Sequence, residues 1–267
     1  MSTTILKSTD FDAKRIEFAQ FKKNKRGGGI VYMKYDNPKA GKHNVFLQTP
    51  KMYCPFGASA FKKEDLKDGE VPKYSLQLSF RGHEDNKPVD DLKEKLESFD
   101  NMIVEEVLKN KELQANLGLS NKKNLSKDTI SVLHSPMVRY PAKPEYAATL
   151  NVKLPVVYGT DTFQTDLYGK DKTKIELTYE NIEDVLPARC EVRALLQITA
   201  VWIIGNKFGI SVRASQLVVY PSETLSGYSF LDSSDVEDED ENVLSSDDES
   251  EQSEEEEEES DKEEVVV

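Results

Sequence analysis

The stretch EVRALLQITAVWIIGNKFGISVRASQLVVY, residues 191–220, consists of two long apolar-rich runs on either side of the pair Gly205-Asn206. Runs rich in β-branched and aromatic residues favour extended strands. A two-residue hairpin turn needs positive φ angles, which glycine and asparagine adopt readily. The sequence therefore predicts a long β-hairpin, with one strand over residues 191–204 and the other over residues 207–220.

Shorter strands are predicted upstream of this hairpin. In residues 74–80, Tyr74, Leu76, Leu78 and Phe80 alternate with polar residues, which is the period-two pattern of a strand with one buried face. Further strands are expected at residues 44–49, 129–133, 146–154, 162–167 and 174–178. The body of the chain is therefore expected to be rich in β-strands.

One long helix is predicted among the strands, over residues 89–117. Asp90 and Asp91 lie near its start, where the helix dipole favours negative charge. Its apolar residues recur at three- and four-residue steps and form a single stripe; they are Leu92, Leu96, Phe99, Ile103 and Val107. Many strands, one helix among them and a final hairpin predict a mainly β fold with one long helix, an oligonucleotide-binding (OB) type of barrel with insertions.

The charge of the chain is divided between two regions. Residues 231–267 contain 20 acidic residues and one basic residue, whereas residues 1–230 contain 34 basic and 29 acidic residues. A run of glutamates such as residues 254–259 repels itself and buries nothing. The sequence therefore predicts three parts. They are a flexible basic N-terminal segment at residues 1–29, an OB-like nucleic-acid-binding domain at residues 30–230, and a disordered acidic tail at residues 231–267.

The sequence features of several other classes of protein are missing. Cys54 and Cys190 are too few for a disulfide scaffold or a four-cysteine zinc site, and no apolar run reaches the ~18 residues of a membrane span. Gly27-Gly28-Gly29 lacks the Lys-Ser/Thr pair of a phosphate-binding loop. The three histidines are far apart, and no nucleophile elbow is present. We therefore expect a non-enzymatic, intracellular protein without a cofactor, a metal or a membrane partner.

Neighbouring basic and aromatic residues are spread over the body. Single-stranded nucleic acid is bound by a cationic groove together with aromatic faces on which bases stack. The candidate nucleic-acid-binding residues are Lys51, Tyr53, Lys62, Lys63, Arg139, Tyr140, Lys207, Phe208 and Arg213. Phe80 and Trp202 are expected in the core instead. Each pair also fits a half-buried ring beside a solvated charge, so the prediction rests on the whole collection.

Residues 201–212, VWIIGNKFGISV, resemble the last hairpin of the single-stranded DNA-binding proteins of nucleocytoplasmic large DNA viruses. The strand at residues 74–80, the helix after it and the acidic tail follow in the order of that family, which more distantly resembles the OB-fold replication proteins of short-tailed phages. The phage relatives end in an aromatic residue, whereas this chain ends in three valines, 265–267. The resemblance implies roles in viral DNA replication, recombination and repair, and recruitment of replication proteins by the tail.

The leading hypothesis is sequence-independent binding of single-stranded DNA, with the acidic tail competing for the same groove as a mimic of DNA. The alternative is a histone or protein chaperone whose acidic tail takes basic partners, and a structural virion component is the third hypothesis. A homo-oligomer is left open. The expected location is the host cytoplasm or nucleus at sites of viral DNA replication, with packaging in the virion as a further option.

Overall fold

The computed structural model describes residues 4–24, 28–61, 72–120, 124–157, 160 and 162–221. These residues belong to one compact unit, Met1–Glu223. As the sequence predicts, this unit is mainly β with one long helix. The expected acidic tail, residues 231–267, lies outside the described residues.

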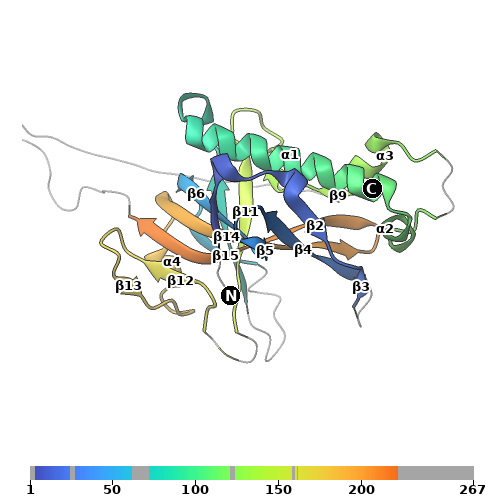
Figure 1. Cartoon of the computed structure of the whole chain (residues 1–267). Helices are drawn as coiled ribbons and strands as arrows, with labels where there is room; N and C mark the ends of the chain where they lie inside the picture. Colours follow the sequence, from blue (N-terminus) through green and yellow to red (C-terminus); the bar gives the residue numbers. More distant parts are fainter. Residues whose placement is uncertain are drawn as a thin grey trace, which may run out of the picture. The chain divides into compact units, whose positions relative to one another are not determined.

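Figure 1 shows the elements coloured in chain order, with labels on many of them. The strands are β1 (Ile5–Lys7), β2 (Ile16–Phe18), β3 (Lys22–Lys23), β4 (Gly29–Asn37), β5 (Gly41–His43), β6 (Val45–Cys54), β7 (Ala58–Phe61), β8 (Lys73–Ser79), β9 (His134–Ser135), β10 (Val138–Arg139), β11 (Thr149–Leu154), β12 (Asp166–Tyr168), β13 (Lys174–Ile175), β14 (Cys190–Ile204) and β15 (Lys207–Tyr220). The helices are α1 (Lys87–Lys109), α2 (Lys111–Asn116), α3 (Lys127–Ser131) and α4 (Ile182–Val185).

Five strands are joined in a closed circuit of pairings. β6 pairs with β8, β8 with β11, β11 with β15, β15 with β14, and β14 again with β6. The β11–β15 pairing is parallel and the other four are antiparallel. Two seams rest on one residue pair each, Tyr53 with Ser79 and Lys153 with Arg213. The circuit is therefore held mainly by its three longer ladders, β14–β15, β6–β14 and β8–β11.

The predicted final hairpin is confirmed. β14 and β15 pair from Glu191 opposite Tyr220 to Ile204 opposite Lys207. Gly205 in the turn has a φ of 58°, the left-handed conformation that glycine adopts without strain. β4 pairs with the end of β14 beside this turn and extends the sheet outside the circuit.

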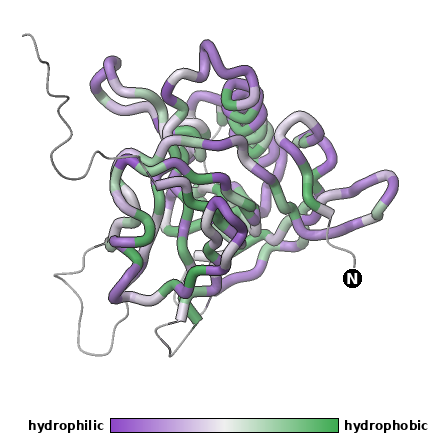
Figure 2. Tube along the Cα trace, turned by 90° about the vertical axis from the view of Figure 1, so that its left-hand side faces the viewer, coloured by the Kyte–Doolittle hydropathy of each residue, from purple (hydrophilic) through white to green (hydrophobic). Residues whose placement is uncertain are grey.

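Alternate residues of the circuit strands fill its interior. Leu76 and Leu78 of β8 and Leu150 and Val152 of β11 are fully buried. In Figure 2 the hydrophobic parts of the trace lie inside, and many of the loops around them are hydrophilic. The period-two pattern in residues 74–80 therefore marks a core strand, as predicted.

The long helix packs its predicted apolar stripe inward. All five stripe residues are buried: Leu92, Leu96, Phe99, Ile103 and Val107. The helix ends before Asn110, which has an extended backbone. The side-chain Oδ1 of Asn110 caps α2 by accepting hydrogen bonds from the amides of Glu112 and Leu113. The single helix predicted over residues 89–117 is therefore two helices, because a residue that caps a new helix ends the preceding one.

The N-terminal segment differs from its prediction as a flexible arm. The described part of residues 1–29 contains β1, β2 and β3. Phe11 is 1% exposed, and its ring centroid lies 5.6 Å from that of Phe99 on α1 and 6.0 Å from that of Tyr35 on β4. Burial of apolar side chains offsets the entropy lost on ordering a segment, and this term outweighs the polar composition of the segment.

A second difference concerns residues 129–133, which the sequence predicts as a strand. They overlap α3 instead. Ser126 caps this helix, because its hydroxyl oxygen accepts a hydrogen bond from the Thr129 amide at 3.2 Å. A good cap outweighs the β-propensity of a few residues.

Two further observations concern the excluded classes. The described residues include no helix long and apolar enough to cross a membrane. Cys54 and Cys190 face each other across the β6–β14 ladder, where both are buried and free of disulfides.

We expect Leu78→Ala to lower the free energy of unfolding by about 2–5 kcal/mol, because it leaves a cavity inside the circuit. Gln77→Ala, on the outward side of the same strand, should change it by less than about 1 kcal/mol. Urea unfolding of the two variants measures the difference. Equal losses would contradict the assignment of the circuit interior as the core.

Candidate nucleic-acid interface

A cavity of about 420 Å³ opens beside β15 where this strand changes partners. β9 pairs with β15 at Phe208 and Gly209, and β11 pairs with it at Arg213. Residues 210–212 lie between the two pairings and line the cavity. The facing walls come from residues 135–137 and from β11. The cavity is therefore a gap in the sheet, at the edge of β15.

The backbone of β15 presents polar groups to this gap. The Phe208 amide donates to the Leu133 carbonyl at 3.1 Å, and the Ala214 carbonyl accepts a side-chain hydrogen bond at 2.9 Å on the same edge. Because backbone groups alternate between the two edges of a strand, the groups of Ile210 and Val212 point to this edge as well. Between the pairings with β9 and β11, the Ile210 carbonyl and the Val212 amide have no strand opposite them in the described part of the chain.

Trp202, the only tryptophan of the chain, lines the cavity from β14. It pairs with Gly209 of β15 on one side and with Ile30 of β4 on the other. A Cβ atom at position 209 would lie 2.7 Å from Trp202 Cζ2, so the indole rests on the bare backbone of Gly209. The side chain is partly exposed, and this exposed part forms the aromatic wall of the cavity.

Basic side chains from four neighbouring strands meet here. Arg139 of β10 and Lys153 of β11 line the cavity, Arg213 of β15 is the register partner of Lys153, and Lys73 of β8 is close enough to act on the pKa of Lys153. We call these four residues the basic cluster. None of them forms an ion pair with a carboxylate among the residues that the structure describes, and no acidic residue appears in the described lining.

The environment of Lys153 favours an anion. Its ammonium donates to Ser211 Oγ at 3.3 Å. Burial lowers the pKa of Lys153, and the positive charges of Lys73 and Arg139 lower it further. Neighbouring cations destabilise the charged ammonium, and a bound anion would reverse that effect.

Neutral side chains hold the guanidinium of Arg213. Its Nε and Nη2 donate to Gln197 Oε1 at 2.8 and 2.6 Å, and its Nη1 donates to Gln164 Oε1 at 3.2 Å. These amide oxygens orient the group without cancelling its charge. Arg213 therefore stays positive and fixed in place.

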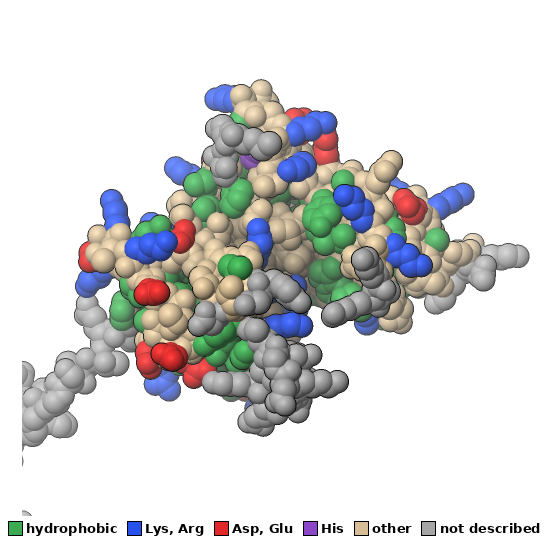
Figure 3. All heavy atoms as spheres, turned by 90° about the horizontal axis from the view of Figure 1, so that it is seen from below, with side chains coloured by type: hydrophobic (Ala, Val, Ile, Leu, Met, Phe, Trp, Pro, Cys, Tyr) green, Lys and Arg blue, Asp and Glu red, His purple; other side chains and the backbone are tan. Residues whose placement is uncertain are grey.

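A second exposed ring lies on the same outer face as Trp202. Tyr32 of β4 is 46% exposed, and Lys22 Nζ lies 5.5 Å from the centroid of its ring. Tyr32 is opposite Ala200, and Ile30 is opposite Trp202, so the two rings are diagonal neighbours in the sheet, within reach of one another. On the face of the molecule seen in Figure 3, Lys and Arg side chains are interspersed with hydrophobic ones, and most of the visible Asp and Glu side chains lie toward one side.

A buried carboxyl group fixes residues 134–139, one wall of the cavity, to α1. Asp100 Oδ2 accepts hydrogen bonds from the amides of Met137 at 2.9 Å and Val138 at 3.5 Å, and its Oδ1 lies 3.3 Å from His134 Nε2. Burial raises the pKa of Asp100 to about 7 and lowers the pKa of His134 to about 4. A protonated Asp100 then donates to the neutral imidazole. This hydrogen bond gives a partner to two buried atoms that otherwise have none.

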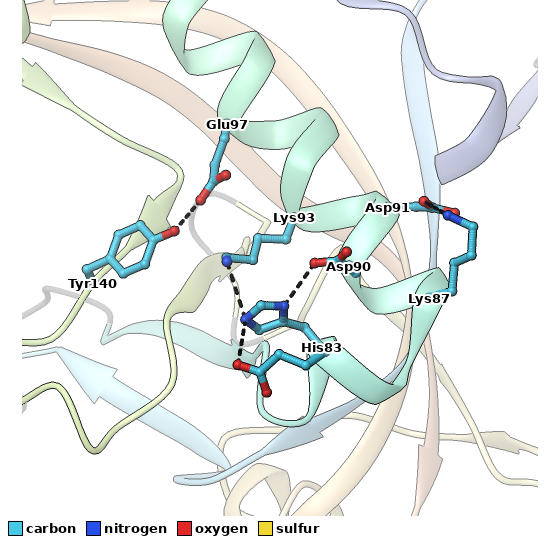
Figure 4. A network of polar contacts seen from close by, with 8 residues as sticks. His83, Lys87, Asp90, Asp91, Lys93, Glu97 and Tyr140 are labelled. Carbon is cyan, nitrogen blue, oxygen red and sulfur yellow. Dashed lines mark hydrogen bonds and ion pairs between the residues drawn. The ribbon is translucent and has the colours of Figure 1, made fainter.

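Tyr140, next to Arg139, is held by α1. Its hydroxyl donates to Glu97, and Lys93 Nζ lies 5.6 Å from the centroid of its ring. Lys93 also lies 3.3 Å from His83 Nε2, and His83 Nδ1 lies 2.9 Å from Asp90 Oδ1. Figure 4 shows the contact between Tyr140 and Glu97 and, next to it, the contacts that join Lys93, His83 and Asp90. Tyr140 is 65% exposed, but the network fixes its position.

The structure brings only some of the predicted binding residues together. Arg139 and Arg213 belong to the basic cluster, and Tyr140 is adjacent to it in sequence. Lys207 is exposed at the start of β15, where its Nζ donates to the Val132 carbonyl at 2.7 Å. Lys62 and Lys63, also predicted, lie outside the described residues.

Lys51 and Tyr53, two further predicted binding residues, do not line the cavity. Lys51 Nζ is 2.5 Å from Glu191 and 5.3 Å from the ring centroid of Tyr220, and the guanidinium of Arg81 is 5.6 Å from the ring centroid of Tyr53. Glu191 lies at the open end of the hairpin, and Trp202 lies near its turn. The two residues are roughly 35 Å apart along an extended strand. Lys51 and Tyr53 therefore lie toward the opposite end of the hairpin from Trp202, outside the cavity lining.

Phe208, which the sequence analysis predicted to bind nucleic acid, is a core residue. It is 0% exposed, and its ring stacks on His134 with 5.0 Å between centroids. A ring buried on both faces cannot stack with a base. The alternation along β15 explains the error, because Phe208 is on the inward side of the strand.

Sequence reasoning also missed Trp202, Lys73 and Lys153. The sequence carried a signal for Lys153, because Thr149, Asn151 and Lys153 form the polar side of β11. The sequence carried no signal for the exposure of Trp202, because the neighbouring residues of the strand are apolar throughout. The exposure of the indole depends on Gly209 opposite it, which only the pairing of the strands reveals.

The chain is similar to a described family and to a solved structure. Residues 9–262 match the model of a family described as "Protein of unknown function (DUF2738)". No curated protein matches the chain. A solved structure, that of gp2.5, a single-stranded DNA-binding protein encoded by bacteriophage T7, is similar with a TM-score of 0.37 and 9% sequence identity, over 70% of this chain and 91% of that chain. Among the described residues, no group of three or more His, Cys, Asp or Glu side chains is placed to hold a metal ion.

We expect Asp100→Asn to fold normally, because an amide can accept from the Met137 amide and donate to His134 Nε2. Its stability relative to wild type should rise as the pH increases from about 4 to about 7, since within this window folded wild-type protein holds a proton on Asp100 that the unfolded chain releases. Urea unfolding across this range measures the difference.

Asp100→Ala is the control for this prediction. It leaves the amides and the imidazole without a partner, so it should lose about 1–3 kcal/mol. An Asn variant as unstable as the Ala variant would contradict the hydrogen bonds assigned to this carboxyl group.

Proposed function

We propose that this chain, which belongs to the family described as "Protein of unknown function (DUF2738)", binds single-stranded DNA across the outer face of β4, β14, β15 and β11. The observation that carries the proposal is the position of Trp202 beside the basic cluster, whose cations have no carboxylate partner within the described part of the chain. Proteins that hold single strands without reading their sequence combine such a cationic groove with rings on which bases stack.

Each part of this face has a counterpart in a single strand. Trp202 and Tyr32 offer rings to bases, at ~1–3 kcal/mol for each stack. Lys153, Arg139 and Arg213 offer charge to phosphates, and each contact releases counterions. In a duplex the faces of the bases are hidden within the stack, so the rings favour a strand with unpaired bases.

The closed circuit is further interpreted as an OB-type barrel, in which five strands close a small, partly open barrel. OB barrels bind oligonucleotides on the face of their second and third strands and with two loops, one between the first two strands and one between the last two. The corresponding parts here are β8 and β11, the connection from β6 to β8, and the turn between β14 and β15. Residues 62–71 of the connection from β6 to β8 lie outside the described residues. Lys73 and Lys153 of the basic cluster belong to β8 and β11, and the cavity-lining residues Trp202 and Ile204 come just before the turn, which supports the proposal.

The proposal also includes a role in the replication, recombination and repair of viral DNA. Sequence-independent binding suits the protection of unwound strands during replication, recombination and repair of viral DNA in the host cytoplasm or nucleus. Residues 231–267 would compete for the groove as a mimic of DNA and recruit replication proteins. The chaperone alternative needs no cavity with an aromatic wall, so the geometry favours the DNA-binding role.

We expect the protein to bind oligothymidylate more tightly than a duplex of equal length. Trp202, as the only tryptophan, should report binding directly by fluorescence quenching. Lys153→Ala should weaken binding and reduce the slope of log K against log salt by about one phosphate contact, since a lost contact no longer releases a counterion. Titrations at several salt concentrations measure both effects.

The matched control is Lys87→Ala. Lys87 also carries one positive charge, but it is an exposed residue on α1 paired with Asp91 at 2.9 Å. It should leave the affinity and the salt slope nearly unchanged. Equal effects of the two variants, or tighter binding of the duplex, would contradict the proposed interface.

We expect deletion of residues 231–267 to tighten single-strand binding at low salt. This segment carries 20 acidic residues and one basic residue, and tethering gives it an effective concentration on the order of millimolar at the groove. The gain should shrink as salt rises, because the Debye length falls to ~8 Å at physiological ionic strength. Fluorescence titration of the full chain and the truncated chain measures the gain.

A free peptide of residues 231–267 separates competition from general repulsion. If the tail competes for the groove, the peptide inhibits the truncated protein more than an equal charge of simple salt does. No excess inhibition would limit the tail to solubility or to binding of partners.

A further inference from the structure

The cavity beside β15 combines an aromatic wall with hydrogen-bonding groups that have no partner among the residues the structure describes. The Ile210 carbonyl and the Val212 amide face it from the edge of β15. Asn151, on the opposite wall, has a buried side-chain oxygen without a hydrogen-bond partner in the described structure. Buried polar atoms in proteins normally have partners. This arrangement is therefore suited to a ligand that supplies hydrogen bonds of its own beside a ring.

The size and charge of the cavity narrow the class of that ligand. Its volume of about 420 Å³ is within the range of small-molecule sites, ~300–1,000 Å³. Arg139 and Lys153 line it, and no acidic residue of the described chain does. The fitting ligand carries a negative charge next to a polar aromatic group. A nucleotide has this combination, since the edge of each base bears hydrogen-bond donors and acceptors.

We propose that this cavity is a base-binding subsite, which receives one unstacked base of a bound strand. The base lies against Trp202, with its edge toward Asn151 and the backbone groups of Ile210 and Val212. The phosphate attached to the same nucleotide lies at Lys153 and Arg139. This proposal rests on the proposed function and makes it more specific: one nucleotide of the strand is enclosed, while the others lie on the open face.

Two other occupants fit the cavity less well. A peptide added to the edge of β15 would pair with residues 210–212, but β9 and β11 close this interval at both ends. Inorganic phosphate alone would use the basic cluster and leave the aromatic wall and Asn151 without a role. A mononucleotide uses all three features.

Thymidine monophosphate is the direct probe. We expect it to bind the full chain and to quench Trp202 fluorescence, with at least about tenfold higher affinity than inorganic phosphate at equal ionic strength. Isothermal calorimetry with both ligands measures the two affinities. Oligothymidylate is titrated in parallel, so that the subsite and the wider interface are judged separately.

A matched pair of variants tests the position of the base. Asn151→Leu keeps the size of the side chain and removes its hydrogen bonds, and it should weaken thymidine monophosphate by about tenfold. Asn116→Leu makes the same substitution on α2, outside the cavity lining. It should change the affinity less than twofold. Thermal unfolding of both variants confirms that each is folded.

Each outcome decides between the two proposals. Oligothymidylate binding without binding of thymidine monophosphate, or equal affinities for thymidine monophosphate and phosphate, would overturn the subsite and leave the interface standing. Equal effects of Asn151→Leu and Asn116→Leu would also overturn it. Failure of oligothymidylate to bind at all would overturn the proposed function.

Discussion

The pairing of Lys153 with Arg213 closes the five-stranded circuit, and the candidate site depends on it. This parallel seam consists of one residue pair, and nearer the hairpin turn β15 pairs with β9 instead. The interval between the two pairings exposes residues 210–212 to the cavity. A longer β11–β15 ladder would cover the same backbone groups. The short pairing of β11 with β15 therefore both closes the circuit and leaves the cavity beside it.

The same seam places two cations opposite each other, which ordinarily destabilises a sheet. Arg213 is held there by the neutral oxygens of Gln197 and Gln164, and Lys153 by Ser211. These contacts position the charges without cancelling them. The buried interior of the circuit and the long β14–β15 ladder supply the stability that the seam does not. The molecule thus tolerates an unfavourable charge arrangement at the place where a polyanion would relieve it.

The sequence predicted the elements with the strongest periodicity and missed what depends on pairing between distant strands. The hairpin at residues 191–220, the strand at residues 74–80 and the apolar stripe of α1 follow from local patterns. The boundary at Asn110 does not, because a cap interrupts an apolar pattern that continues beyond it. In the candidate site, Arg139 and Arg213 were found, whereas Trp202 was assigned to the core because only its pairing with Gly209 leaves it partly exposed.

The two proposed ligands of the groove share only part of the site. Carboxylates of residues 231–267 resemble phosphates in charge, but they have no aromatic ring and no donor–acceptor edge. They match the basic cluster and leave Trp202, Asn151 and the edge of β15 unused. A strand of DNA uses both parts, and contacts with bases are less sensitive to salt than contacts with phosphates. The advantage of DNA over the tail would therefore come from the cavity, while the basic cluster sets how strongly the two compete.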